Sequence, residues 1–469
     1  MLRKTKIIAT LGPATESPEI IDALIRGGVN LFRLNMSHAP PEWCREVTAR
    51  ARKAAEAAGL DVAILMDMRG PTIRTGDLSP SVQLNKGDTV EFTLNDAPAS
   101  HPISTSVNYP GLYLDLKKGD TVLVDNGILQ MTVLETSPER VICCVVTEGK
   151  LGSRRHINLP GIRVNLPALT QKDFDDVLLA VETGCDWVAM SFVRDASHIH
   201  QLRRELRAKG CHAHIMAKIE DQQAVAHLDE IIEASDAVMV ARGDLGIEVH
   251  MEELPVIQRR IVNRCIIRGK PVVVATHMLE SMITNPVPTR AEVTDVANAV
   301  FEEADAIMLS GETSSGAYPI RCVEAMAKIA LRAEAADCTP SMARHSAITN
   351  DKQRLVKAAV DLADSIEGAS IIVFTQRGVL AGYAAWFRPQ RAHIFAFCPD
   401  LTIARALHLS RALCPFQLAF DPKNRRESIE RAVEVLKRKR LIREGTSLVI
   451  ISDVLETESA MDSIVVQKA

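Results

Sequence analysis

The chain has 469 residues, of which 47% are hydrophobic and 24% charged, which predicts a globular protein of two to four domains. Its formal net charge of −4 argues against a general binder of nucleic acids or membrane surfaces. No apolar run approaches the ~18 residues that a membrane-spanning helix needs.

Short apolar runs that end in polar residues predict eight strands. These runs are 6–10, 29–35, 62–67, 187–192, 214–220, 237–244, 271–277 and 305–312. Helical patterns lie between them, including 42–58, 173–182, 197–209, 222–233, 255–268 and 290–302. Thr170 with Asp173, and Thr289 with Glu292, fit helix N-caps. Eight such β/α units predict a (β/α)8 TIM barrel.

The interval between the third and fourth strands, residues 76–168, has a different pattern. Short alternating runs are separated by turn sequences, Lys-Gly-Asp twice and Asp-Asn-Gly once. This pattern predicts an inserted all-β domain. Because the insertion follows the C-terminal end of a barrel strand, where active-site loops lie, we expect it to act as a lid.

A second α/β pattern begins after a polar joint near residue 336. Its predicted helices and strands are 352–366, 370–375, 393–399, 427–440 and 447–452. The predicted fold class is therefore α/β. A catalytic barrel of residues 1–75 and 169–335 carries the insertion 76–168 and a C-terminal α/β domain of residues 336–469.

The cysteines and the first residues of the chain indicate the cellular compartment in which the protein is expected. The ten cysteines are scattered and form no Cys-x-x-Cys pair, which favours reduced thiols in the cytoplasm. The first residues, MLRKTKIIATLG, have an apolar part too short for a secretory signal.

In barrels of this kind the C-terminal ends of the strands carry the chemistry. Here these ends hold cations, carboxylates and hydroxyls, with no Cys nucleophile and no His-rich zinc set. The set is Thr10, Arg33, Asn35, Ser37, Asp67 with Arg69 and Arg74 just beyond it, Lys218, Glu220, Arg242, Gly243, Asp244, Thr276, His277, Ser310 and Glu312.

Glu220 and Asp244 are expected at the same depth on neighbouring strands. Two oxygen ligands without His or Cys suit Mg²⁺ or Mn²⁺. Lys218 lies two residues before Glu220, so both point to the same side of the strand. A cation beside a metal-bound anion suits transfer of a charged group, and Arg33 can add a second cationic contact. Gly243 lets backbone amides approach an anion.

Structural roles compete with these interpretations. Lys218 and Glu220 could form an ion pair that lines the barrel, Thr276 could be an ordinary hydroxyl, and Asn35 and Ser37 could be turn residues. The residues alone therefore predict a metal-assisted barrel enzyme for a small anionic substrate. They do not choose between phosphoryl transfer and aldol-type enolate chemistry.

Long, ordered motifs across residues 1–335 resemble the pyruvate kinase family. They are KTKIIATLGPAT (4–15), FRLNMSH (32–38), MDMRGPTIRTG (66–76), INLPG (157–161), MAKIED (216–221), VMVARGDLGIE (238–248), ATHMLESMITNPVPTRAEVTDVANAV (275–300) and IMLSGET (307–313). The insertion resembles the B domain of that family, and residues 336–469 resemble its C-terminal regulatory domain more weakly.

The resemblance implies transfer of a phosphoryl group from phosphoenolpyruvate to ADP, followed by protonation of the enolate to pyruvate. Arg33 would contact the phosphoryl group and Lys218 would stabilise it in transit. Glu220 and Asp244 would bind Mg²⁺ or Mn²⁺. Gly243, Asp244 and Thr276 would bind the enolpyruvate end, with Thr276 near the delivered proton.

The resemblance also implies a monovalent cation site, a nucleotide site and a homotetramer. K⁺ would be held by Asn35, Ser37, Asp67 and the backbone carbonyl of Met68. The nucleotide would be bordered by Asn35, His38, Arg74 and Arg155.

Five departures from the family pattern bear on these expectations. Thr72 stands where relatives that need K⁺ have Glu and relatives that supply the charge have Lys, so K⁺ dependence is left open. Arg154-Arg155-His156 replaces Lys-Lys-Gly, and His277 replaces Gln. The sugar-phosphate loop is changed at 375–380 (TQRGVL), and 452–466 adds acidic residues. We therefore expect no activation by fructose 1,6-bisphosphate through this loop.

Two other functions are weighed against a kinase. A Mg²⁺-dependent pyruvate aldolase or lyase would share the enolate chemistry, but the insertion and Lys218 disfavour it. A non-catalytic metabolite-binding protein would suit the altered C-terminal loop. The presence of Lys218, Glu220, Asp244 and Thr276 together disfavours that second alternative.

Overall fold

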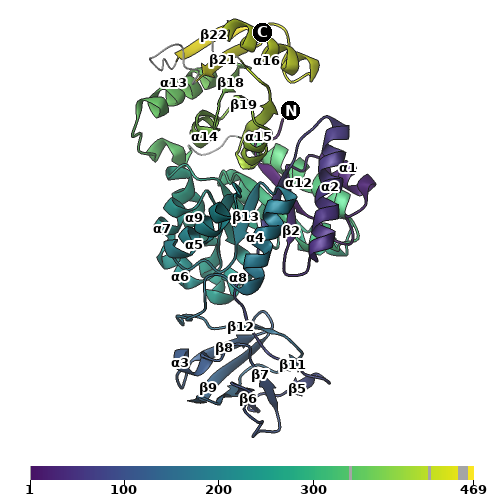
Figure 1. The fold of residues 1–469 in the computed structure, drawn as a ribbon, viewed down its shortest axis with the longest axis vertical. Helices are drawn as coiled ribbons and strands as arrows, with labels where there is room; N and C mark the ends of the chain where they lie inside the picture. Colours follow the sequence, from purple (N-terminus) through teal and green to yellow (C-terminus); the bar gives the residue numbers. More distant parts are fainter. Residues whose placement is uncertain (1, 337–340, 421–423, 453–462) are drawn as a thin grey trace.

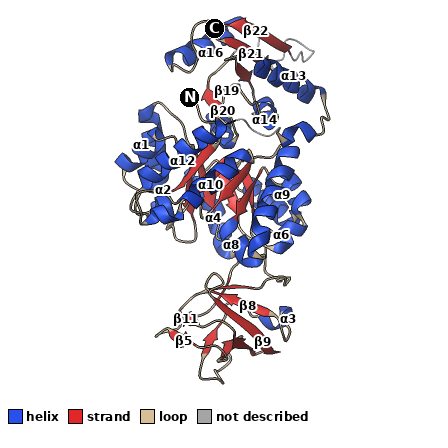
Figure 2. Ribbon diagram, turned by 180° about the vertical axis from the view of Figure 1, so that it is seen from behind, coloured by secondary structure: helices blue, strands red, loops and turns tan. Residues whose placement is uncertain are grey.

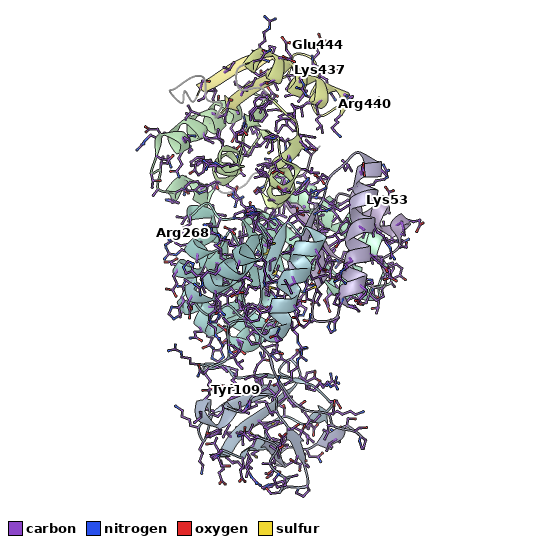
Figure 3. All side chains as sticks on the ribbon, in the orientation of Figure 1. Lys53, Tyr109, Arg268, Lys437, Arg440 and Glu444 are labelled. Carbon is purple, nitrogen blue, oxygen red and sulfur yellow. The ribbon has the colours of Figure 1, made fainter. Side chains whose placement is uncertain are left out.

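The computed structural model describes residues 2–336, 341–420, 424–452 and 463–469. The molecule is elongated, with a barrel in the middle, the insertion at one end and the C-terminal domain at the other (Figure 1). Helices surround the central strands, whereas the insertion consists almost entirely of strands (Figure 2). Charged side chains of both signs cover the outside, including Lys53 on the barrel and Lys437 and Glu444 on the C-terminal domain (Figure 3).

Eight parallel strands close into a barrel, which confirms the predicted fold. In spatial order they are β1 (Lys6–Thr10), β17 (Ala306–Leu309), β16 (Val272–Ala275), β15 (Ala237–Ala241), β14 (His214–Ile219), β13 (Trp187–Met190), β3 (Ala63–Asp67) and β2 (Leu31–Asn35). Alternate residues face opposite sides of each strand, so Ile8 and Met239 fill the interior while Ile7 and Val240 pack on the helices.

Helices follow the strands and cover the barrel. They are α1 (Pro18–Arg26), α2 (Pro41–Ala58), α4 (Gln171–Thr183), α5 (Ala196–Ala208), α6 (Gln222–Ala226), α7 (Leu228–Ala234), α8 (Arg242–Glu248), α9 (Leu254–Ile267), α10 (Arg290–Phe301), α11 (Gly311–Ser314) and α12 (Pro319–Glu334). Both predicted caps form full capping boxes, Thr170 with Asp173 and Thr289 with Glu292. The predicted helix 222–233 is two helices, because the backbone of His227 leaves the helical region between them.

The strand predicted over 237–244 ends earlier, at Ala241. Helix α8 begins at Arg242, so Asp244 lies in the first turn of a helix and not on a strand beside Glu220. The expected equal depth of Glu220 and Asp244 on neighbouring strands is therefore wrong. The first turn nevertheless favours an anion, because unpaired N–H groups and the helix dipole concentrate positive potential there.

The insertion has its own sheets and its own hydrophobic core. A seven-stranded sheet has the order β4 (Ile73–Arg74), β12 (His156–Asn158), β8 (Thr121–Val124), β9 (Leu129–Ser137), β10 (Arg140–Val145), β6 (Thr89–Thr93) and β7 (Ser104–Ser106). A smaller sheet pairs β5 (Val82–Leu84) with β11 (Gly149–Leu151), and one short helix, α3 (Leu112–Asp115), interrupts the strands. Strands β4 and β12 pair where the chain leaves and re-enters the barrel.

The C-terminal domain is a five-stranded sheet with helices on its faces. The strand order is β20 (Leu413–Gln417), β19 (His393–Cys398), β18 (Ser370–Phe374), β21 (Ser447–Ser452) and β22 (Ser463–Lys468), and only β22 is antiparallel. The helices are α13 (Asp351–Ser365), α14 (Val379–Trp386), α15 (Leu401–Ala406) and α16 (Arg425–Arg438). The two strands that the sequence did not predict are the edge strands, and β20 carries Pro415, which edge strands tolerate.

Four 3₁₀ turns complete the described structure: η1 (Met251–Glu253), η2 (Glu280–Ile283), η3 (Met342–His345) and η4 (Leu407–Leu409). In the described part of the chain, no helix combines the length and apolarity that crossing a membrane requires.

A buried ion pair fastens the C-terminal domain to the barrel. Arg388 donates two hydrogen bonds of 2.6 Å to the carboxylate of Asp305, the residue before β17. The same carboxylate accepts from the backbone N–H groups of Val272 and Arg411. The side chain of Asp305 therefore links strands β16 and β17 of the barrel to two segments of the C-terminal domain, at Arg388 and at Arg411.

Candidate active site

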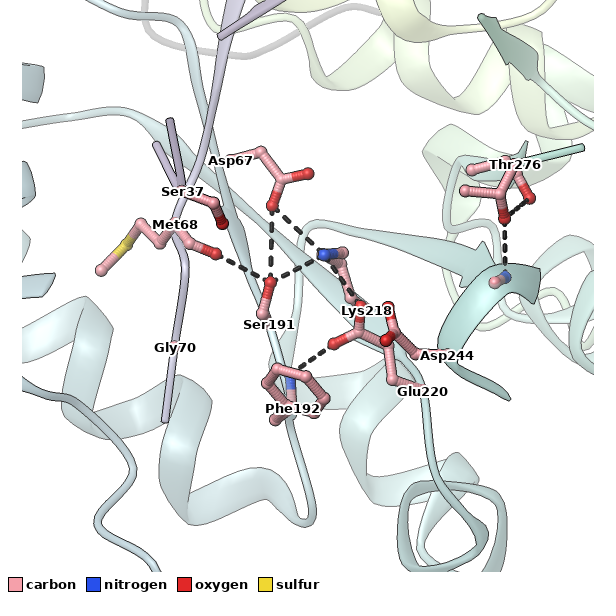
Figure 4. Close-up of polar contacts among 12 residues, drawn as sticks. Ser37, Asp67, Met68, Gly70, Ser191, Phe192, Lys218, Glu220, Asp244 and Thr276 are labelled. Atoms are coloured by element: carbon pink, nitrogen blue, oxygen red, sulfur yellow. Dashed lines mark hydrogen bonds and ion pairs between the residues drawn. The ribbon is translucent and has the colours of Figure 1, made fainter. Parts of the chain in front are cut away.

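The predicted site residues gather where the strand ends of the barrel face the insertion. Figure 4 shows Asp67, Ser191, Lys218 and Glu220 in one cluster, with Asp244 beside Glu220 and Thr276 on a neighbouring loop. Each comes from a different barrel unit, except Lys218 and Glu220, which share the end of β14.

Lys218 is the centre of this cluster. Its Nζ donates a 2.7 Å hydrogen bond to the hydroxyl of Ser191 and lies 2.8 Å from Glu220 Oε1 and 3.3 Å from Asp67 Oδ1. The contact with Glu220 confirms that both side chains lie on the same side of the strand. On the far side of Asp67, Arg33 Nε donates to Oδ2 at 2.6 Å.

These contacts fix the charge states of the cluster. Burial alone lowers the pKa of Lys218, but the carboxylates of Asp67 and Glu220 outweigh burial and raise it. Burial raises the pKa of Asp67, but Lys218 and Arg33 outweigh burial and hold it below its ordinary value. Lys218 therefore carries a permanent positive charge in a site with little water, where it acts strongly on a nearby anion.

Ser191 is a site residue that the sequence analysis missed. It accepts a hydrogen bond from Lys218 and donates one of 2.7 Å to the carbonyl oxygen of Met68, joining the ends of β3 and β14. It directly follows β13. The predicted set contains no residue from the fourth strand, 187–192. Applying the strand-end rule to that strand as well would have identified Ser191.

Glu220 and Asp244 fit a divalent metal ion such as Mg²⁺. Glu220 is 1% exposed. Its Oε2 accepts from the backbone N–H of Phe192, whereas the one partner of Oε1 among the described residues is Lys218, in an ion pair. Burial raises the pKa of Glu220, and the charge of Lys218 opposes that rise. The negative charge of Asp244 raises the pKa of Glu220 further. A cation between Glu220 and Asp244 would relieve the repulsion between their carboxylates. Among the described residues no cluster of three or more His, Cys, Asp or Glu occurs. Two protein ligands are enough for Mg²⁺, because water molecules and substrate oxygens occupy its other coordination positions.

Thr276 and Gly243 form the second half of the site. The backbone N–H of Gly243 donates a 2.8 Å hydrogen bond to Thr276 Oγ1. Thr276 and His277 both have positive φ, +67° and +56°, which is costly for residues with side chains. The guanidinium of Arg242 holds this loop by donating to the carbonyl oxygens of Ala275 and Thr276. Arg242 is therefore a structural clamp of the Thr276 loop.

The residues expected around K⁺ lie together, but three of them already have partners. Asp67 is shared by Arg33 and Lys218, and the carbonyl of Met68 accepts from Ser191. Asn35 Oδ1 accepts from the backbone N–H of Ser37, as in a turn. Figure 4 shows Ser37 between Asp67 and Met68. The oxygens are of the kind that K⁺ takes, although protein cations already neutralise part of their charge.

The residues expected around the nucleotide are spread over the barrel and the insertion. His38 is exposed at the turn after β2, and Arg74 lies on β4, where it donates to Thr72 Oγ1 and to the carbonyl of Arg154. Thr72 therefore holds Arg74. The guanidinium of Arg155 pairs with Asp125, 3.2 Å away in the insertion, and shows no contact with the catalytic cluster.

The insertion approaches Asp244, one of the candidate metal ligands, through His156. Its Nδ1 lies 4.0 Å from Asp244 Oδ1, and its ring packs edge-on against Phe192. Burial lowers the pKa of His156, and Asp244 opposes that effect. The Lys-Lys-Gly pattern of the resemblance would put a glycine here, which has no ring to make either contact.

Two capping or strand-end residues also shape the site. Asp173 caps α4 and in addition accepts from the backbone N–H of Gly70, so it holds the loop after β3. Glu312 accepts from the backbone N–H groups of Leu279 and Ser310, which gives it a structural role.

The altered C-terminal loop is only partly covered by the described residues. Thr375 is fully buried, and no described residue bonds its Oγ1. Gly378, with φ +81°, precedes α14. Most of the acidic segment 452–466 lies outside the described residues, which omit 453–462.

Known proteins match this chain over nearly its whole length. The model of the pyruvate kinase barrel domain matches residues 2–323, and that of the pyruvate kinase alpha/beta domain matches residues 353–467. Plastidial pyruvate kinase 2 of Arabidopsis thaliana is 38% identical over 452 residues, 96% of this chain and 78% of that protein. A pyruvate kinase of Geobacillus stearothermophilus is 38% identical over 462 residues, with coverage of 97% and 78%. The crystal structure of a pyruvate kinase from Cryptosporidium parvum has a TM-score of 0.93 and 33% identity, covering 99% of this chain and 96% of that one.

Proposed function

This chain belongs to the pyruvate kinase family of phosphotransferases, and we propose that the cluster around Lys218 carries the transfer from phosphoenolpyruvate to ADP. In this reaction the bond from phosphorus to the enol oxygen breaks and a bond to a terminal phosphate oxygen of ADP forms. The enolate then takes a proton at C3 and becomes pyruvate. The observation that carries this assignment is a buried, charged lysine in contact with Glu220, one of the two carboxylates that suit Mg²⁺.

In the proposed mechanism Lys218 and Arg33 stabilise the phosphoryl group. Its charge spreads over three oxygens during transfer, and fixed cations stabilise that charge most in a site with little water. Asp67 and Ser191 hold Lys218 in place, so the cation needs no reorganisation when the charge develops.

Gly243, Asp244 and Thr276 bind the enolpyruvate end in this proposal. The hydroxyl of Thr276 is oriented by the N–H of Gly243 and lies on a loop held by Arg242. We propose that this hydroxyl passes a proton to C3 of the enolate, or holds the water that does so, once it gives up the hydrogen bond that it donates to the carbonyl oxygen of Ala275.

Glu220 and Asp244 would hold Mg²⁺ or Mn²⁺, which would neutralise charge on the substrate oxygens. Asn35, Ser37, Asp67 and the carbonyl of Met68 would hold K⁺. Because Thr72 is engaged with Arg74 and brings no charge, we propose that K⁺ supports activity in this chain.

The nucleotide is proposed to lie against Asn35, His38, Arg74 and Arg155. Arg155 would leave Asp125, its partner within the insertion, and we propose that the insertion closes over the nucleotide as a lid. We keep the predicted boundaries, with the lid at 76–168 and the C-terminal domain at 336–469. The hydrophobic cores support three parts, although Ala343, beyond the proposed boundary, packs in the core of the barrel.

We also propose a homo-oligomer, a tetramer as is usual in the family, in the cytoplasm. Large apolar side chains are exposed around α9 and α10: Met251 (82%), Val256 (63%), Val287 (66%) and Phe301 (45%). Exposed apolar groups on neighbouring barrel elements indicate an association surface. The described cysteines are all free thiols, which supports a reducing compartment.

Activation by fructose 1,6-bisphosphate through residues 375–380 is not expected, because this loop lacks most of the hydroxyl and cationic groups that would hold two phosphates. Adding the bisphosphate should leave the KM for phosphoenolpyruvate unchanged. Activation that disappears in a Thr375→Ala, Arg377→Gln double variant would contradict this expectation.

The test of the proposed site measures pyruvate formed from phosphoenolpyruvate and ADP with Mg²⁺, with and without K⁺. Lys218→Met should reduce kcat by at least about a thousandfold, since it removes a cation aimed at the developing charge. Lys357→Met, which removes a surface lysine of the C-terminal domain, is the matched control and should behave like wild type. Equal loss in both variants, or none in Lys218→Met, would overturn the assignment.

A further inference from the structure

Strand β12 of the insertion lies against helix α8 of the barrel (Figure 1). Side chains alternate along a strand, so His156 and Asn158 share one face of β12, while Ile157 packs in the core of the insertion. Residues four apart share one face of a helix, so Asp244 and Glu248 lie on the same side of α8. The two faces meet, and each of the two β12 side chains has one α8 carboxylate opposite it.

The contact near the end of α8 anchors β12. Asn158 is 4% exposed, and its Nδ2 donates a 2.8 Å hydrogen bond to Glu248 Oε1. The turn between β8 and β9 also reaches α8, because a Cβ on Gly127 would lie 3.7 Å from Ile247 Cγ2. A hydrogen bond that is partly shielded from water, together with this packing, fixes β12 on α8. The anchor places His156 beside the first turn of the helix.

The second contact, between His156 and Asp244, is not a closed hydrogen bond. The side chain of His156 is 12% exposed, and its Nδ1 lies 4.0 Å from Asp244 Oδ1, about 1 Å more than a hydrogen bond. Among the described residues, no side chain or backbone group forms a hydrogen bond with the ring nitrogens of His156 or with the carboxylate of Asp244. A further approach of about 1 Å would therefore supply both groups with a partner.

We propose that His156 is a positioning residue, which orients the carboxylate of Asp244 for the divalent metal ion. A neutral imidazole has one N–H, and donating it to one carboxylate oxygen leaves the other oxygen free for the metal. Partners that hold a metal ligand in this way change metal affinity by about tenfold or more. The inference rests on the proposed assignment of Glu220 and Asp244 as the metal ligands.

The same contact makes metal binding depend on the position of the insertion. If the arrangement that brings His156 to Asp244 binds the metal more tightly, the metal must in turn favour that arrangement. The ring of His156 also packs edge-on against Phe192, whose backbone N–H donates to Glu220. One side chain of the insertion thus lies next to both candidate metal ligands, beside Asp244 itself and one residue away from Glu220.

The test measures Mn²⁺ binding to the full chain from the EPR signal of free Mn²⁺, without phosphoenolpyruvate or nucleotide. His156→Ala should weaken Mn²⁺ binding by about tenfold. His156→Gln keeps an N–H and should retain most of the affinity, whereas His156→Phe keeps only the ring packing and should be as weak as His156→Ala. His200→Ala removes an exposed histidine of α5 and should bind Mn²⁺ like wild type.

Hydrogen exchange read by mass spectrometry tests the dependence in the other direction. Saturating Mn²⁺ should slow amide exchange in residues 156–158 of wild type, and should slow it much less in His156→Ala. Equal protection of this strand by Mn²⁺ in the two proteins would contradict the link between the metal and the insertion.

Glu220→Gln separates the role of His156 from the metal assignment beneath it. Mn²⁺ binding that is lost in Glu220→Gln but unchanged in folded His156→Ala would overturn the positioning role alone, as would equal weakening in His156→Gln and His156→Phe. Unchanged binding in Glu220→Gln, or no binding by wild type, would contradict the metal assignment and the inference with it. Thermal unfolding shows which variants are folded, and His156→Gln against His156→Phe decides the matter if His156→Ala is not.

Discussion

Lys218 illustrates at the scale of one residue how burial and charge are balanced. Taking an ammonium group out of water is expensive, and a buried cation persists only with good partners. Asp67, Glu220 and the Ser191 hydroxyl supply those partners, all within 3.3 Å of Nζ. The arrangement leaves the cation charged and fixed, as a phosphoryl-transfer site requires.

Ser191→Ala removes the neutral partner of Lys218 and the link to Met68. Because the hydrogen bond involves a charged group, we expect kcat to fall by about tenfold or more, with less change in the KM for phosphoenolpyruvate. Steady-state kinetics on the folded variant measure this. Ser197→Ala, at the exposed start of α5, is the control, and a Ser191→Ala enzyme with wild-type kcat would rule out the positioning role.

At the scale of elements, the site depends on loops that adopt costly conformations. The loop after β3 needs Gly70, which has φ +66°, and a Cβ there would lie 3.0 Å from the carbonyl oxygen of Ser191. The loop after β16 places Thr276 and His277 in the left-handed region and is held by Arg242. These loops fix the spacing between the two halves of the site.

Gly70→Ala should therefore lower both stability and activity. The left-handed backbone costs about 1–2 kcal/mol for any L-residue, and the contact with Ser191 displaces a partner of Lys218. Gly59→Ala is a matched control, because Gly59 has φ +63° and nothing lies within 4 Å of its Cβ position. Urea unfolding should show a loss for both variants, whereas kcat should fall only for Gly70→Ala; unchanged kcat there would contradict the account.

At the scale of the whole molecule, the C-terminal domain covers the end of the barrel opposite the lid (Figure 1). Arg388 and Asp305 form the centre of this contact, and Trp187 of β13 donates to the carbonyl of Ala406. His408 is buried at the same contact, and its Nε2 has no hydrogen-bond partner among the described residues. The contact therefore excludes water and penalises any new charge.

The stability of this contact should depend on pH. Burial, reinforced by Lys6, Arg52 and Arg405, lowers the pKa of His408 to about 3. Between that value and the ordinary value of about 6.5, the unfolded chain binds a proton that the folded chain does not, so stability falls as pH falls. We expect a loss on the order of 2 kcal/mol from this group between about pH 7 and pH 5.

Urea unfolding of wild type and His408→Leu at both pH values measures this dependence. The variant should lose less stability between pH 7 and pH 5 than wild type does. Identical pH dependence in the two proteins would show that His408 does not control it.

The sequence predicted the barrel and its two additional domains because strand periodicity, turn dipeptides and the position of the insertion are local signals. It failed where the outcome depends on contacts between distant segments. The strand 237–244 was predicted too long because nothing local shows that Arg242 turns back to bind Thr276. The edge strands β20 and β22 lack a clear local pattern, and Ser191 becomes a site residue only through Lys218 and Met68.

We expect the two halves of the site to be separable, with Lys218 serving phosphoryl transfer and Thr276 serving the proton at C3. Deuterium incorporation at C3 of pyruvate, followed by NMR in D₂O with Mg²⁺ beside the kinase assay, distinguishes the two roles. Lys218→Met should lose phosphoryl transfer and keep most of the exchange, whereas Thr276→Val should lose most of the exchange. Loss of both activities to the same extent in Lys218→Met, or undiminished exchange in Thr276→Val, would contradict the account.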